Sequence, residues 1–107
     1  MKRPPSISSK RDFERALRSG SRNRAPFGTI FVSRGPDPGA PARLGLAVPS
    51  RVGGAVVRNR IKRRLRASFA AAQPRQGLDV VVRAGLPALS LGFQEMERTF
   101  AELGEAR

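Results

Sequence analysis

The order of apolar and polar positions along the chain predicts a helix, two strands with room for a third short one, a longer helix, a further strand and a final helix. The first helix is expected over residues 10–19. Ser9, with an acid three positions later, is typical of a helix start, and Gly20 of a stop. The apolar positions between them recur at helical spacing: Phe13, Ala16 and Leu17.

Two runs that follow, residues 27–33 and 44–48, have the β-branched and aromatic content or the alternation of strands. Residues 34–39 between them are rich in Gly and Pro and predict a turn. We therefore expect the two strands to form an antiparallel hairpin. Alternation gives each strand one face of interest: Phe27, Thr29 and Phe31 in the first, and the small Gly45 and Ala47 in the second.

From Ala55 onward, the apolar positions recur with the period of a helix. An apolar stripe recurs through this segment: Val57, Ile61, Leu65, Ser68, Phe69 and Ala72. Six of the remaining positions are cationic: Arg58, Arg60, Lys62, Arg63, Arg64 and Arg66. Residues 78–84 then predict a buried strand. A last helix is expected from its apolar face: Phe93, Met96, Phe100 and Leu103.

Composition narrows the possible functions. The 107 residues include 21 Lys or Arg and 8 Asp or Glu, a formal charge of +13, so a polyanion is the first partner to consider. The absence of His and Cys excludes Ser-His-Asp, Cys-His and Cys/His zinc chemistry. The acids are thinly spread, so we expect no catalytic residues and no metal ligands in this chain.

The length fits one domain, residues 1–107, whose first eight residues form a basic, Pro-containing tail. No internal repeat occurs. No apolar run is long enough to span a membrane, and no apolar segment follows the basic N-terminus as a secretion signal requires. We therefore expect a cytoplasmic protein without a membrane role.

Two features of the sequence allow more than one interpretation. The cations of residues 58–66 form either a rigid face that binds phosphates or an ordinary solvated face, and a basic helix can also lie on anionic lipid. The lipid interpretation is disfavoured because the apolar stripe is needed to cover the neighbouring strands. The aromatic face of residues 27–31 either stacks unpaired bases or packs under a helix.

The sequence resembles the bacterial ribonuclease P protein family over most of its length. The resemblance rests on residues 44–48, Arg51-Val52-Gly53 and residues 55–66, above all on Arg-Asn-Arg followed by Ile-Lys-Arg. It implies a two-layer α/β domain of order αβββαβα with an unusual left-handed β-α-β crossover, a fold shared with the second domain of a small-subunit ribosomal protein.

The resemblance also implies a function. Members of the family are subunits of a ribonucleoprotein endoribonuclease that removes the 5′ leader from precursor tRNA. A catalytic RNA holds the magnesium ions and carries out the cleavage, and the protein assists. We expect one monomeric protein per catalytic RNA, with precursor tRNA as the second partner. A basic ribosomal or structural RNA-binding protein is the alternative. A DNA-binding protein is a weaker third, because no recognised docking motif occurs.

Site residues follow from the same resemblance. Contacts to the catalytic RNA are implied at Arg58, Asn59, Arg60, Lys62, Arg63, Arg64 and Arg66, and contacts to the leader at Phe13, Phe31, Arg11 and Arg51. The chain departs from the family pattern at Pro49 and Ser50, beside Arg51, and at Leu17 and Gly28, where relatives are often aromatic. These departures imply weaker leader stacking, or stacking on other residues.

Overall fold

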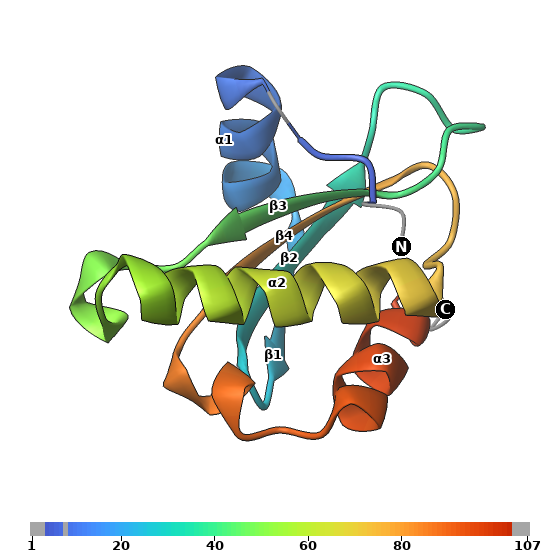
Figure 1. Cartoon of the computed structure of the whole chain (residues 1–107). Coiled ribbons are helices and arrows are strands. Elements are labelled where there is room, and N and C mark those ends of the chain that lie inside the picture. Colours follow the sequence, from blue (N-terminus) through green and yellow to red (C-terminus); the bar gives the residue numbers. More distant parts are fainter. Residues whose placement is uncertain (1–3, 8, 104–107) are drawn as a thin grey trace.

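The computed structural model describes residues 4–7 and 9–103, which form a four-stranded sheet with helices on both faces (Figure 1). The elements in chain order are α1 (Lys10–Ser19), β1 (Ser21–Ala25), β2 (Gly28–Arg34), β3 (Arg43–Ala47), the 3-10 turn η1 (Ser50–Val52), α2 (Ala55–Ala72), β4 (Leu78–Ala84), the 3-10 turn η2 (Leu86–Leu89) and α3 (Phe93–Ala101). This order confirms the predicted αβββαβα arrangement.

The predicted hairpin between the strands at residues 27–33 and 44–48 is wrong. The strand order is β1-β2-β4-β3, so β4 lies between β2 and β3. It pairs antiparallel with β2 and parallel with β3. Val80, Val81 and Val82 of β4 are fully buried, and a strand that is apolar on both faces belongs in the centre of a sheet.

The antiparallel partner of β2 on its other side is β1, which the sequence analysis did not identify. Its sequence, Ser-Arg-Asn-Arg-Ala, has no apolar face, and its first four residues are exposed. It is an edge strand, and charged side chains on an edge protect it from pairing with other chains. Such a strand gives almost no periodic signal in the sequence.

The β3–α2–β4 unit joins two adjacent parallel strands through an 18-residue helix. In Figure 1, α2 lies in front of the sheet, β3 and β4 both run from right to left, and β4 lies below β3. When the picture is turned so that these two strands point upward, the chain moves leftward from β3 to β4. The crossover is therefore left-handed, as the family resemblance implies, against the strong preference of proteins for the right-handed form.

The main core lies between the sheet and the pair α2 and α3. Four residues of the predicted α2 stripe are buried there: Ile61, Leu65, Ser68 and Phe69. The predicted apolar face of the last helix is confirmed at Met96 and Phe100, whereas Phe93 is 41% exposed at the start of α3. A smaller cluster on the other face of the sheet holds α1, through Ala16, Phe31 and Val81.

The predicted common face of Phe27, Thr29 and Phe31 is wrong for Phe27. This residue precedes β2 and packs in the main core, where its ring centroid lies 5.4 Å from that of Phe100. Phe31 points to the opposite face, under α1, and is only 4% exposed. Both rings therefore occupy core positions.

Gly28 lies between Phe27 and Phe31 in the sequence, and its backbone dihedral angles are ones that other residues adopt only with strain. Its φ is +152°, and an added Cβ would lie 2.0 Å from the carbonyl oxygen of Arg83. The departure from the family pattern at this position thus suits this backbone.

We expect Gly28→Ala to lower the free energy of unfolding by about 1–3 kcal/mol, because it adds both backbone strain and a collision. Gly85→Ala is the matched control. Gly85 has a φ of −134°, and an added Cβ would meet Pro87 Cδ only at 3.7 Å. Urea titrations of the two variants measure the difference. Equal midpoints would contradict the assigned strain.

Candidate nucleic-acid interface

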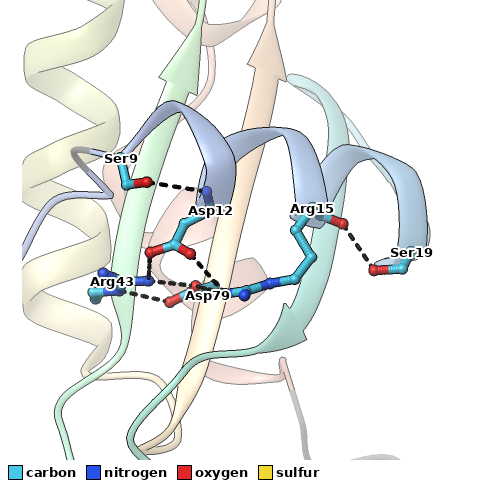
Figure 2. A network of polar contacts seen from close by, with 6 residues as sticks. All are labelled: Ser9, Asp12, Arg15, Ser19, Arg43 and Asp79. Carbon is cyan, nitrogen blue, oxygen red and sulfur yellow. Dashed lines mark hydrogen bonds and ion pairs between the residues drawn. The ribbon is translucent and has the colours of Figure 1, made fainter.

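A network of ion pairs fixes α1 on the sheet (Figure 2). Arg43 of β3 donates from Nε to Asp79 Oδ1 at 2.8 Å and from Nη2 to Asp79 Oδ2 at 2.6 Å. The same Nη2 donates to Asp12 Oδ2 of α1 at 3.0 Å. Arg15 Nη2 lies 2.9 Å from Asp12 Oδ1 and 3.9 Å from Asp79 Oδ2. We call these four residues the Arg43 clamp.

The charges of the Arg43 clamp stabilise one another. The hydrogen bond from Arg43, together with the positive charge of Arg15, lowers the pKa of Asp12 below its usual value of 3.8, although desolvation acts in the opposite direction. The hydrogen bonds to Asp79 raise the pKa of Arg43 above its usual value. Both carboxylates are therefore committed to arginines.

The Arg43 clamp also places Phe13, the residue after Asp12, against β3. An added Cβ at Gly45 would lie 2.9 Å from Phe13 Cε2, so this strand approaches the ring because it carries glycine there. Phe13, Gly45, Lys62 and Arg66 line a cavity of about 170 Å³ between α1, β3 and α2, which the segment of residues 4–7 closes on one side. An aromatic ring and two cations thus meet in one small cavity.

The cations of α2 point in several directions. Asn59, Arg60 and Arg63 are exposed on its outer surface. Lys62 and Arg66, one turn apart, line the cavity beside Phe13. Arg58 is half-buried, and its Nε donates to the carbonyl oxygen of Gly53 at 3.1 Å. The residues predicted to contact the catalytic RNA therefore do not form one uniform face.

Arg64 is turned toward α3. Its Nε donates to the carbonyl oxygen of Ala88 at 2.9 Å, and its Nη2 donates to the carbonyl oxygen of Leu91 and lies 3.9 Å from Met96 Sδ. These bonds connect the middle of α2 to η2 and to the segment that follows it. The guanidinium therefore holds the core together, a role that the cationic pattern of the sequence did not reveal.

The residues predicted to contact the leader differ in how far their side chains are exposed. Arg11 on α1 and Arg51 in η1 are exposed, and Phe13 is half-buried at the cavity. Phe31 lies under α1, and the guanidinium of Arg22 from β1 lies 5.4 Å from its ring centroid. Because the Phe31 ring is buried, Phe13 is the more accessible of the two rings.

No group of three or more acids in the described part of the chain could hold a metal ion. Asp12 and Asp79, which do lie close together, already accept hydrogen bonds from Arg43 and do not fit a magnesium site. Among the helices of the described residues, none is long and apolar enough to cross a membrane.

Known proteins show the same combination of sequence and fold. The family model Ribonuclease P matches residues 1–106. The ribonuclease P protein component of Kocuria rhizophila is 40% identical over 91 residues, covering 82% of this chain and 78% of the relative. That of Shouchella clausii is 41% identical over 100 residues, covering 90% and 80%.

Solved structures agree in fold. The RNase P protein of Staphylococcus aureus matches with a TM-score of 0.74 at 24% identity, covering 94% of this chain and 92% of that one. The RNase P protein of Thermotoga maritima matches with a TM-score of 0.76 at 19% identity, covering 92% and 96%. The fold and surface thus define a class, the small basic α/β domains with this architecture. The family match over residues 1–106 then shows that the chain belongs to the ribonuclease P protein family.

Arg63 and Arg64 are neighbours with different surroundings, and their alanine variants should separate the two roles. We expect Arg64→Ala to lower the free energy of unfolding by about 1–2 kcal/mol, because it leaves the carbonyl groups of Ala88 and Leu91 without their donor. Arg63→Ala removes an exposed side chain and should change stability by less than about 0.5 kcal/mol. Thermal unfolding measures both. Equal stability of the two variants would contradict a stabilising role for the hydrogen bonds of Arg64.

The lowered pKa of Asp12 predicts acid sensitivity. The ionised carboxylate favours the folded state, so its contribution is fully present above the usual value of 3.8 and is lost as the pH falls through the lower folded-state value. Asp12→Asn should therefore be less stable than the unchanged protein near neutral pH, and the difference should shrink in acid. Glu14→Gln, on the same helix, controls for the loss of a negative charge. Urea titrations from about pH 7 to about pH 2.5 measure the trend, and a difference independent of pH would refute it.

Proposed function

We propose that this chain is the protein component of a bacterial ribonuclease P, acting in the cytoplasm on the 5′ ends of precursor tRNAs. The family match supports this assignment over residues 1–106. The observation that carries it within the structure is the outer surface of α2, where Arg60 and Arg63 are exposed on a helix whose opposite side is locked into the core.

That surface suits the phosphates of a folded RNA. Guanidinium groups bind phosphate oxygens through two parallel hydrogen bonds, and a helix anchored by Ile61 and Leu65 holds them without further ordering. Arg64 does not belong to the proposed contact surface, because its donors already bond to carbonyl groups. The proposed catalytic-RNA contacts are therefore Asn59, Arg60 and Arg63, extended by Lys62 and Arg66 on the cavity side.

The cleavage chemistry is proposed to belong to the RNA. Hydrolysis of a phosphodiester at neutral pH requires metal ions or general acids and bases. The two acids that lie close together, Asp12 of α1 and Asp79 of β4, are occupied by arginines, and the sequence contains no His or Cys. Magnesium would thus be bound by the partner RNA, and the protein would contribute positioning and charge.

The cavity between α1 and α2 is the proposed contact for an unpaired nucleotide of the leader. Phe13 offers a ring for base stacking, and Lys62 and Arg66 offer cations for the adjacent phosphate. Phe31 is less suited to this role because α1 covers it. The leader contact would then depend mainly on Phe13 among the predicted aromatic residues.

The Arg60→Ala/Arg63→Ala double variant should weaken binding to the catalytic RNA and flatten its salt dependence. Each lost phosphate contact removes roughly 0.7 to 0.9 from the slope of log K against log salt concentration. Arg98→Ala, an exposed cation on α3, is the control for a general loss of charge. Binding titrations at several salt concentrations give the slopes. An unchanged slope in the double variant would rule out phosphate contacts at these two residues.

The decisive experiment is cleavage of precursor tRNA by the catalytic RNA of the same genome at low magnesium, with and without this protein. Strong stimulation, absent when the protein is assayed alone, supports a holoenzyme subunit. Tight RNA binding without stimulation would instead support the alternative, a ribosomal or structural RNA-binding protein.

A further inference from the structure

Two adjoining cavities lie beside the C-terminal end of α2, at the right of Figure 1, where the loop that follows this helix meets the loop between β2 and β3. The first, which we call the proline cavity, has a volume of about 470 Å³. Its walls are formed mainly by prolines and one aromatic ring: Pro4, Pro5, Pro41, Pro74 and Phe69. The second, which we call the loop cavity, has a volume of about 490 Å³ and lies between the two loops. Gln76 lines both cavities and so joins them.

The proline cavity is lined by uncharged residues, although the chain carries a net charge of +13. Among the described residues that line it, the polar side chains are the amides of Gln73 and Gln76. A cavity of this size, with apolar walls and a few polar groups, is typical of a ligand site. An unpaired nucleobase matches it, because its flat faces pack on apolar side chains and its edge carries donors and acceptors that amides can pair with.

Gln73 has an unusual backbone for its residue type. It follows α2 with a φ of 49° and a ψ of 65°, and it alone among the described non-glycine residues has a positive φ. Helices commonly end in this left-handed conformation with a glycine, because a residue with a Cβ adopts it with strain. Strained residues persist where the surrounding structure holds them, and they gather at binding sites. A glycine here would relieve the strain but would remove the amide from the proline cavity.

The loop cavity is cationic. It is lined by Arg34 at the end of β2 and by Arg75 in the loop after α2, both exposed, and by no acid among the described residues. Two backbone hydrogen bonds connect the loops: Gly35 N donates to the carbonyl oxygen of Gly77 at 2.8 Å, and Gly77 N donates to that of Ala40 at 2.8 Å. These bonds fix the backbone that carries the arginines. A phosphate suits this cavity, since guanidinium groups bind its oxygens through parallel hydrogen bonds.

We propose that the two cavities together bind one unpaired nucleotide of an RNA partner, with the base in the proline cavity and the phosphate in the loop cavity. This inference rests on the proposed function, which supplies the RNA, and adds a site that the family resemblance did not indicate. The site is separate from the outer cations of α2. Arg63 and Gln73 are ten residues apart, about 15 Å along the helix, and residues 67–72 between them carry no charge. A nucleotide bound here would therefore hold the RNA at a second point and fix its direction along α2.

The first test measures binding of the full chain to the catalytic RNA, and of the holoenzyme to precursor tRNA, at several salt concentrations. Gln76→Ala should weaken one of these interactions about fivefold, the loss of one uncharged contact, and leave its salt slope unchanged. Arg34→Gln should weaken the same interaction and reduce its salt slope by roughly 0.7. The interaction that changes identifies the RNA that supplies the nucleotide.

Gln73→Gly should have opposite effects on stability and binding, which a purely structural role for Gln73 does not predict. The glycine relieves the positive φ, so the urea midpoint of unfolding should rise. Loss of the amide should weaken the same RNA interaction as Gln76→Ala. Gln94→Ala and Arg98→Gln are the matched controls, because they remove an exposed amide and an exposed cation from α3. Neither should reproduce the loss of affinity.

A crosslink tests the position of the nucleotide directly. The sequence contains no Cys, so Gln76→Cys allows a single photoreactive group to be attached where the two cavities meet, and Gln94→Cys provides the control on α3. After irradiation of the holoenzyme with bound precursor tRNA, the group at position 76 should be joined to one unpaired nucleotide. That nucleotide should belong to the RNA whose affinity the other variants lower.

The outcomes separate this inference from the proposed function. Unchanged affinities in Gln76→Ala and Gln73→Gly, or a crosslink no stronger from position 76 than from position 94, would overturn the nucleotide site while the holoenzyme assignment stands. The urea titration identifies a variant that does not fold, in which case Arg34→Gln and the crosslink decide. A protein that stimulates no cleavage and binds neither RNA would overturn the proposed function, and this inference with it.

Discussion

The structure depends on one buried carboxylate and the arginine that neutralises it. Asp79 lies on the central strand and is 1% exposed, and a charge in that position is tolerated only when it is paired and hydrogen-bonded. Arg43 provides both bonds from the neighbouring strand and extends to Asp12 on α1. The pairing of β3 with β4 and the position of α1 are thereby set by the same guanidinium. The placement of Phe13, and with it the cavity, follows from that position.

The Arg43 clamp also shows how a chain of charge +13 divides its cations. Arg43 and Arg64 are used inside the molecule, one bonded to carboxylates and the other to carbonyl groups of a connecting segment. Arg60 and Arg63 are left on the surface. Net charge therefore overstates the surface available to a polyanion, and an individual arginine contributes only where its donors are unoccupied.

The sequence predicted the elements better than their partners. The bounds of α1 and β4, the apolar stripe of α2 and the Ser9 cap all follow from local spacing, and the structure confirms them. Strand pairing does not follow from local spacing, so the expected hairpin was wrong. β1 is polar and lacks the alternation of apolar residues that predicts a strand. Arg63 and Arg64 looked equivalent, because only the packing of α3 distinguishes two residues that are 100° apart on one helix. The family resemblance supplied the crossover hand, which no local pattern encodes.

Exposed cations occur on both sides of the sheet. The outer cations of α2 and the exposed Arg24 and Arg83 of the strands lie on opposite sides of the sheet, with the main core between α2 and the strands. Substitutions at sites that are distant and share no partners have additive effects, so the two groups of cations can be varied separately. The cavity lies between the helices of the two faces, where Phe13 comes from α1 and Lys62 from α2. It therefore connects the two sides of the sheet at the edge formed by β3, and the Arg43 clamp fixes the side on which Phe13 lies.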